Sequence, residues 1–290
     1  MKNKKTVGII LAGGYGTRLY PLTSSFSKHL FQIYDKPMIY YSLSILFLAK
    51  IKDILIICTS RDHSFYKNLF NDGQDFGVNI KYLIQDDPKG IVHALSLSKN
   101  FCNNSNICTI LGDNFFHSDN LTSLLTNSKK RSGASIFCYQ VDNPSQYGIL
   151  EIKNSKIKIT EKPSKSSSNL AITGLYFFDN NIFKYIDQIK PSKRGEYEIT
   201  DLINLYLNQD NLHYEVLGRG ATWYDSGTID DMLSVSNYVK LLQNRQNNII
   251  ACLEEISLNN NWISKFHLKK KFIKIKNNCN YSKYIWNLVS

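Results

Sequence analysis

The residues best suited to binding an anion lie in the segment LAGGYGTRL, residues 11–19. Closely spaced glycines let the backbone approach a ligand, and successive backbone N–H groups in such a turn form a nest for an anion. Arg18 adds a planar, permanently charged group that matches phosphate oxygens. The segment therefore predicts a phosphate-binding loop, with a purely structural glycine turn as the alternative.

Two common phosphate-binding motifs do not fit this loop. A dinucleotide fingerprint that begins at Gly14 requires glycine at position 19, which is Leu19. A P-loop requires lysine after its last glycine, and Gly16 is followed by Thr17. Neither of these two motifs therefore accounts for the loop.

Further charged residues could serve the same site. Lys28 follows the loop closely enough to bring a second cation to the same phosphates, although a lysine near a turn is often only solvated. Asp113 comes directly after an apolar run, and Asp225 stands among turn residues. Mg²⁺ takes one or two carboxylates together with substrate phosphates, so these acids are candidate metal ligands. Each has a structural alternative, which for Asp225 is the capping of the helix that follows.

The segment Glu161-Lys162-Pro163 offers an acid and a base side by side. In an extended chain the two side chains point to opposite faces. Both reach one pocket only if the chain bends there, which Pro163 favours. An ordinary surface pair is the alternative.

Apolar runs predict the elements that position these residues. Strands are expected at 7–12, 53–59, 78–83 and 106–111, and helices at 39–49 and 90–97. This alternation predicts an α/β fold, Rossmann-like, with a mixed, mostly parallel sheet flanked by helices. In such sheets ligands bind outside the carboxyl ends of the strands, where the glycine loop and Asp113 are expected.

The pattern changes after residue 132. The second half is predicted to complete the same sheet and to form the wall of a pocket. Close-spaced strands are expected there at 134–141, 148–152, 156–160 and 170–178. A helix is expected at 229–242, and a small helical appendage at 250–290.

Composition narrows the class of protein. The chain has 290 residues, of which 43% are hydrophobic, and a formal net charge of +11. That charge suits an anionic partner, but no nucleic-acid-binding motif or focused basic patch accompanies it. Nucleic-acid binding is therefore the least favoured of the functions considered. We find no signal peptide, no apolar run long enough to span a membrane, and no paired cysteine motif. The sequence therefore predicts a cytoplasmic protein without a membrane partner.

Taken together, the motifs are far more specific than any one of them. The sequence resembles the glucose-1-phosphate thymidylyltransferase family of sugar-phosphate nucleotidylyltransferases from about Lys5 to the C-terminus, less closely after about Ile250. The segments that carry the resemblance occur in the family's order and are LAGGxGTRLxPLT, SK, DKPMIYY, LGDN, YG, EKP, ITGLYFFD, RGEYEITD and WxDxGT. DKPMIYY and RGEYEITD distinguish it from relatives that make UDP-, ADP- or GDP-sugars.

The resemblance implies a domain organisation and an activity. It implies a catalytic domain over 1–249, with a nucleotide-binding half of about 1–131 and a sugar-binding half of about 132–249, and a helical segment over 250–290. The implied reaction joins dTTP and glucose-1-phosphate into dTDP-glucose and pyrophosphate, by in-line attack of the sugar phosphate on the α-phosphate with Mg²⁺ as cofactor. Because a phosphate is already a nucleophile, catalysis would depend on positioning and charge neutralisation. A homo-tetramer that serves dTDP-rhamnose and polysaccharide synthesis is implied as well.

The resemblance also assigns roles to individual residues. The nucleotide would be bound by Leu11, Gly13, Gly14, Tyr15, Gly16, Thr17, His29, Gln85 and Gly90. The sugar phosphate would be bound by Tyr147, Gly148, Glu161, Lys162, Ile172, Thr173 and Gly174. Arg18, Lys28 and Lys162 would be catalytic, and Asp113 and Asp225 would hold Mg²⁺.

Some positions depart from the family's pattern. His29 stands where the family has glutamine beside the thymine, and a histidine cannot reproduce the paired hydrogen bonds of an amide. Another nucleotide, such as UTP, or another sugar-1-phosphate therefore remains an alternative. A non-catalytic nucleotide-sugar sensor is a further one, although the five charged residues expected at the site are all present. Tyr15 replaces a usual serine in the glycine loop.

A second departure concerns regulation. The family is feedback-controlled from a second nucleotide site between subunits, built from the segment after LGDN and from a CxEEI region. Here the first segment reads FFHS, residues 115–118. Near position 259 relatives carry a basic residue, whereas this sequence has Asn259. We expect catalysis to be retained and product feedback to be weakened.

Overall fold

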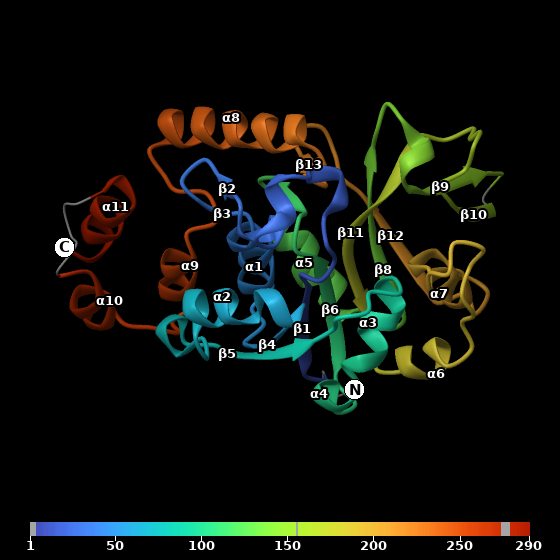
Figure 1. The fold of residues 1–290 in the computed structure, drawn as a ribbon, viewed down its shortest axis with the longest axis horizontal. Coiled ribbons are helices and arrows are strands. Elements are labelled where there is room, and N and C mark those ends of the chain that lie inside the picture. The colour runs from blue at the N-terminus through green and yellow to red at the C-terminus, as the bar shows by residue number, and fades with distance from the viewer. Residues whose placement is uncertain (1–3, 155, 274–278) are drawn as a thin grey trace.

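The computed structural model describes residues 4–154, 156–273 and 279–290. Nine strands form its main sheet: β1 (Thr6–Leu11), β4 (Asp53–Cys58), β5 (Asn79–Ile84), β6 (Asn106–Leu111), β8 (Ala134–Gln140), β9 (Gly148–Lys153), β10 (Lys156–Glu161), β11 (Leu170–Phe178) and β12 (Leu212–Val216). The main path runs β10-β9-β11-β6-β1-β4-β5, with β8 and β12 joined beside β11 (Figure 1). The fold is therefore the predicted mixed α/β sheet.

The parallel part of the sheet lies in the first half of the chain. β1 pairs in parallel with both β4 and β6, and β4 pairs in parallel with β5. Every residue of β1 is buried, because helices cover both faces. Ile10 belongs to the core on one face, and Ile9 and Leu11 belong to the core on the other.

Helices pack on each face of the sheet. One core includes residues of α1 (Ile39–Leu48), α2 (Ser60–Phe70) and α5 (Leu121–Lys130). The other includes residues of α3 (Ile91–Leu97), α4 (Lys99–Cys102), α6 (Ile182–Ile186) and α7 (Ile199–Leu207). Helix α2 gives no clear periodic signal in the sequence, because it buries only Asp62, Tyr66 and Phe70 and is otherwise polar.

The second half of the chain completes the same sheet, as predicted, mostly through antiparallel strands, although β12 pairs in parallel with β8. β11 runs antiparallel to β6, β8 and β9, and its register shifts between Ile172 and Tyr176. Two short pairs, β2 (Gln32–Ile33) with β3 (Lys36–Pro37) and β7 (Phe115–His117) with β13 (Thr222–Tyr224), lie outside the main sheet. α8 (Ile229–Gln246) covers them through Val235 and Val239, which share a core with Ile33 and Phe115.

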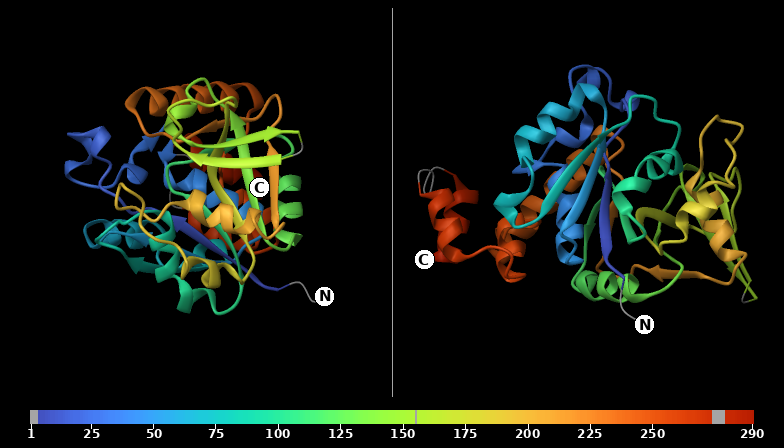
Figure 2. Two further views of the ribbon diagram at one scale, coloured as in Figure 1. Left: turned by 90° about the vertical axis from the view of Figure 1, so that its right-hand side faces the viewer. Right: turned by 90° about the horizontal axis from the view of Figure 1, so that it is seen from below.

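The C-terminal segment is helical, as expected, in its described part. It forms α9 (Leu253–Asn259), α10 (Lys265–Phe272) and α11 (Asn280–Val289). Leu253 of α9 lies in the same core as α1, whereas α10 and α11 share a small core of their own. Figure 2 shows these helices at the end of the molecule opposite the β9–β10 hairpin. In the described part of the chain no helix is long and apolar enough to cross a membrane.

Candidate active site

The glycine loop and Asp113 meet because two parallel strands end together. Leu11, the last residue of β1, pairs with Leu111, the last residue of β6. The N–H of Gly112 donates to the carbonyl of Leu11 at 2.9 Å, which joins the two exits. The sequence-based expectation that both segments lie at one sheet edge is thus reproduced by the structure.

The glycine loop adopts backbone conformations that favour glycine. Gly14 has φ +98° and Gly16 has φ +59°, and a Cβ on Gly16 would lie 2.9 Å from a methyl carbon of Thr23. The loop surrounds a cavity of about 230 Å³, lined by Gly13, Gly14, Gly16, Thr17, Arg18, Leu19, Lys28 and Gly227. Backbone groups and two cations therefore surround one space, as phosphate binding requires. Tyr15 is exposed, and its hydroxyl donates to the Asp86 carbonyl at 3.0 Å.

The Asp225 segment reaches the same space from the other half of the chain. A Cβ added to Gly227 would lie 3.1 Å from Nη2 of Arg18, so the two segments are in contact. Burial raises the pKa of Asp225, and the negative charge of Asp113 raises it further. The charges of the two predicted metal ligands therefore repel one another.

Asp113 has a cation as its direct partner. Lys28 Nζ contacts Asp113 Oδ2, and the two side chains are 13% and 15% exposed. Burial alone would raise the pKa of Asp113, but the Lys28 charge outweighs burial, so that the pKa of Asp113 lies below the ordinary value. Asp113 is thus held ionised, ready to face a cation.

These residues fit a magnesium ion that is completed by phosphates. The described residues contain no cluster of three or more His, Cys, Asp or Glu side chains able to hold a metal alone. Asp113 and Asp225 supply two carboxylates whose mutual repulsion a divalent cation would relieve. Mg²⁺ commonly binds through one or two carboxylates and substrate phosphates, which is the arrangement available here.

A second cavity, of about 360 Å³, adjoins the loop and is suited to a base. It is lined by Leu11, Gly13, Gly14, Lys28, His29, Gln85, Pro88, Gly90, Ile91, Ala94, Leu111, Asp113 and Glu196. Gln85 is held in place because its amide nitrogen lies 2.9 Å from Nδ1 of His93. Gly90 has φ +97°, and a Cβ there would lie 2.6 Å from the Tyr197 carbonyl.

His29 is a fixed, neutral group on the wall of this cavity. Its side chain is buried, and Nδ1 lies 2.7 Å from Oγ of Ser27. Burial, with the nearby Lys28 charge, lowers the pKa of His29 to about 4. Nδ1 also lies 3.5 Å from the Tyr66 hydroxyl, so two hydroxyl groups can donate to it in the tautomer that carries the ring proton on Nε2. Nε2 has no hydrogen-bond partner among the described residues.

The predicted sugar-side residues gather at the β9–β10 hairpin and β11. A Cβ on Gly148 would lie 3.2 Å from Oε2 of Glu161, so the two are neighbours. The chain bends after Glu161 as expected: Lys162 has φ +40°, and its N–H donates to the Tyr147 carbonyl at 3.0 Å. This bend leaves Nζ of Lys162 only 3.9 Å from Glu161 Oε1, so that acid and base serve one face. Burial and then the charge of Glu198 raise the pKa of Glu161.

The three residues of β11 that were predicted to bind the sugar phosphate differ in their contacts. Ile172 is buried near Gly148. The hydroxyl of Thr173 donates to the Phe137 carbonyl at 2.9 Å, so it is engaged inside the sheet. The N–H of Gly174 donates to the Asn114 side chain at 2.9 Å.

Two residues that organise the site received no role from the sequence. Asn114 accepts from Gly174 and from Trp223 Nε1, at 2.9 and 2.7 Å, and donates to Asp113 at 2.9 Å. Arg194 bridges Glu198, at 2.9 Å, and Glu161, at 3.3 Å. Both residues lie in motifs that carry the resemblance, LGDN and RGEYEITD, which is the signal that could have identified them.

The environment of His29 predicts a pH-dependent stability. The folded protein keeps His29 neutral down to about pH 4, whereas the unfolded chain protonates it near the ordinary histidine pKa of 6.5. The unfolded state therefore binds more protons between these values, so stability falls as the pH drops through this window. We expect His29 to make the protein about 2 kcal/mol less stable at pH 5 than at pH 7.

Urea unfolding of the unaltered chain and of His29→Gln, without divalent cations, measures this effect. Between pH 7 and pH 5, the free energy of unfolding should fall by about 2 kcal/mol more in the unaltered chain than in His29→Gln. Equal pH dependence in the two proteins would contradict the assignment of a neutral, buried His29.

Comparison with known proteins places the chain in a family. The sequence profile of the family "Nucleotidyl transferase" matches residues 7–241. Glucose-1-phosphate thymidylyltransferases of Neisseria meningitidis serogroup A and Mycobacterium tuberculosis are 44% and 42% identical, over 97% and 91% of this chain and 99% and 92% of their own. A solved putative glucose-1-phosphate thymidylyltransferase of Bacillus anthracis, in complex with sucrose, is 38% identical with a TM-score of 0.74, and the alignment covers 80% of this chain and 94% of that one. The chain belongs to the nucleotidyl transferase family and, within it, to the glucose-1-phosphate thymidylyltransferases.

Proposed function

We propose that this protein transfers a thymidylyl group from dTTP to glucose-1-phosphate and releases dTDP-glucose and pyrophosphate. The observation that carries the proposal is the meeting of the glycine loop, two cations and two carboxylates where β1 and β6 end. By resemblance to the family, we also propose a cytoplasmic homo-tetramer that acts without a nucleic-acid or membrane partner.

The proposed chemistry requires charge control more than a strong base. The sugar phosphate already carries the attacking oxygen, so the main barrier is repulsion between it and the triphosphate. Arg18 and Lys28 would neutralise the β- and γ-phosphates, and Lys162 would hold the sugar phosphate in line with the α-phosphate. Mg²⁺, held by Asp113 and Asp225, would stabilise the charge that builds up on the leaving pyrophosphate.

The base cavity offers a donor and an acceptor to a thymine. Nε2–H of His29 can donate to a base carbonyl, and the Gln85 amide oxygen can accept from the base N3–H. Apolar side chains of Ile91 and Ala94 line the same cavity and suit the thymine methyl. Uracil has the same imide edge, so the methyl and the ribose must supply the discrimination against UTP.

Pyrophosphate release with glucose-1-phosphate, Mg²⁺ and dTTP, UTP, CTP or GTP in separate reactions tests this assignment. We expect dTTP to exceed UTP in kcat/KM by about tenfold to a hundredfold, the range that one methyl group supplies. CTP and GTP should be far poorer, because they lack the imide edge. A preference for UTP would overturn the base assignment, and release only with another hexose-1-phosphate would overturn the sugar assignment.

Lys162 provides a second test. Its replacement in Lys162→Met should lower kcat by at least about a hundredfold, because it removes a cation from the reacting phosphates. Lys158→Met is a matched control on β10, since Lys158 is 74% exposed and lies 3.8 Å from Glu151. Equal activity of the two variants would show that Lys162 is a surface residue only.

We further propose that product feedback is weak. A cavity of about 260 Å³ between α1, β7 and α9 brings together the segments expected to form the regulatory site, including His117, Ser118, Glu255 and Ile256. No Lys or Arg is among its described lining residues. A diphosphate bound there would lack a cationic partner from this subunit, and losing such a partner weakens binding strongly.

Steady-state inhibition by dTDP-rhamnose measures this feedback. We expect half-inhibition of the unaltered chain to require at least about tenfold more inhibitor than half-inhibition of Asn259→Arg, which introduces a cation at the end of α9. Strong inhibition of the unaltered chain at low micromolar inhibitor would contradict the proposal.

A further inference from the structure

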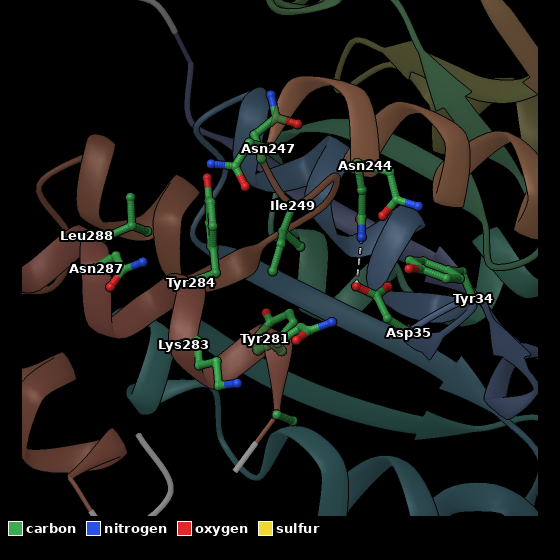
Figure 3. A pocket seen from close by; sticks show the side chains of 14 residues that line it. Tyr34, Asp35, Asn244, Asn247, Ile249, Tyr281, Lys283, Tyr284, Asn287 and Leu288 are labelled. Carbon is green, nitrogen blue, oxygen red and sulfur yellow. Dashed lines mark hydrogen bonds between the residues drawn. The ribbon is translucent and has the colours of Figure 1, made fainter. Parts of the chain in front are cut away.

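A separate cavity of about 700 Å³ lies between the end of α8, the helix α11 and the turn that joins β2 to β3 (Figure 3). None of its lining residues lines the nucleotide cavities. Its size is within the range of small-molecule sites. The reaction proposed above gives it no role.

Side-chain amides dominate the lining of this cavity. The five asparagines among the lining residues are Asn244, Asn247, Asn248, Asn280 and Asn287. All five are exposed to solvent, and none of their amide groups has a hydrogen-bond partner among the described residues, so water occupies these groups until a ligand displaces it. Each amide offers two donors and one acceptor group, so the cavity can both donate to a ligand and accept from it.

Three tyrosines supply apolar faces beside the amides. Tyr281 donates its hydroxyl to Glu254 at 2.6 Å, and the hydroxyl of Tyr284 is hydrogen-bonded to Glu255. Two adjacent glutamates of α9 thus hold these rings before any ligand arrives. The third, Tyr34, stands at the β2–β3 turn, where its backbone N–H donates to Ser236 Oγ at 3.2 Å.

Two residues that line this cavity, Asp35 and Gln243, belong to a fixed polar network. Lys36, whose side chain is 3% exposed, pairs with Asp35 and lies 5.1 Å from the ring centre of Tyr41. Gln243 donates to Asp35 at 3.0 Å and accepts from the Ile250 N–H at 3.0 Å. Asp35, the first residue of the DKPMIYY motif, thus lines this cavity and is held in place by Lys36 of the same motif.

The cavity carries little net charge. α8 ends there, at Asn247, and α11 begins there, so the negative end of one helix and the positive end of the other face the same space. Asp35 and Lys283 are the charged residues of the lining, and because Asp35 is already paired with Lys36, only the single charge of Lys283 is left. A phosphate or a nucleotide would find only this one lysine among the lining residues, and an apolar ligand would strip water from the amides without replacing their hydrogen bonds.

We propose that this cavity binds a neutral saccharide. Sugar hydroxyls donate and accept as amides do, and the C–H face of a sugar ring suits an aromatic ring. The volume and the single lysine of the lining fit an unphosphorylated mono- or disaccharide better than the sugar phosphate of the proposed reaction. The inference goes beyond the proposed function and does not depend on it.

Saturation-transfer NMR and calorimetry on the full chain test the proposal with glucose, galactose, mannose, maltose and cellobiose. The nucleotide cleft is filled with dTDP-glucose and Mg²⁺ so that its sugar subsite is occupied. We expect at least one of these sugars to bind, and Asn244→Ala/Asn287→Ala to weaken that binding at least about tenfold through loss of two hydrogen-bonding groups.

Asn127→Ala is the matched control, because Asn127 is an exposed asparagine of α5 outside the cavity. Asn127→Ala should bind the sugar as the unaltered chain does. Both Asn127→Ala and the double variant should release pyrophosphate at rates within about twofold of the unaltered chain. Absence of binding by all five sugars would overturn the proposal, and so would unchanged binding in the double variant. A change of oligomeric state in the double variant without sugar binding would assign this face to contacts between copies of the chain instead.

Discussion

A carboxylate at the end of a buried strand must have a cation, and this requirement organises the nucleotide site. Asp113 leaves β6 where little water reaches it, so its negative charge is stable only beside Lys28. Asp225 approaches from the other half of the chain and increases the local negative charge. The cleft is therefore most stable when cations enter it, which is the condition that a metal-bound triphosphate provides.

The amide of Asn114, beside this carboxylate, connects the two halves of the protein. Asn114 donates to Asp113 and accepts from Gly174 on β11 and from Trp223 on β13. Movement of the β6 end would thus move the strands that carry the sugar side. Because both phosphates must be held in line within a short distance, this rigid connection is the structural basis of the proposed catalysis by positioning.

Much of the fold could be predicted from the sequence, for a physical reason. Strands buried on both faces, such as β1 and β6, appear as continuous apolar runs, and parallel strands deliver the residues after them to one edge. The bend at Lys162 was predictable from Pro163. Helices such as α2 were not, because a half-exposed helix with few apolar positions gives a weak periodic signal. The roles of Asn114 and Arg194 depend on hydrogen bonds between segments far apart in the chain, which no local pattern encodes.

A double-mutant cycle on Lys28 and Asp113 tests the central claim most directly. The free energy of unfolding is measured without divalent cations for the unaltered chain, Lys28→Met, Asp113→Asn and the double variant. If Asp113 requires a cation, Lys28→Met alone should be the least stable, and the coupling energy should reach at least about 2 kcal/mol. Mg²⁺ should restore part of the stability of Lys28→Met but not of the double variant. Additive effects within about 0.5 kcal/mol would contradict the account, because Asp113 would then tolerate burial without a partner.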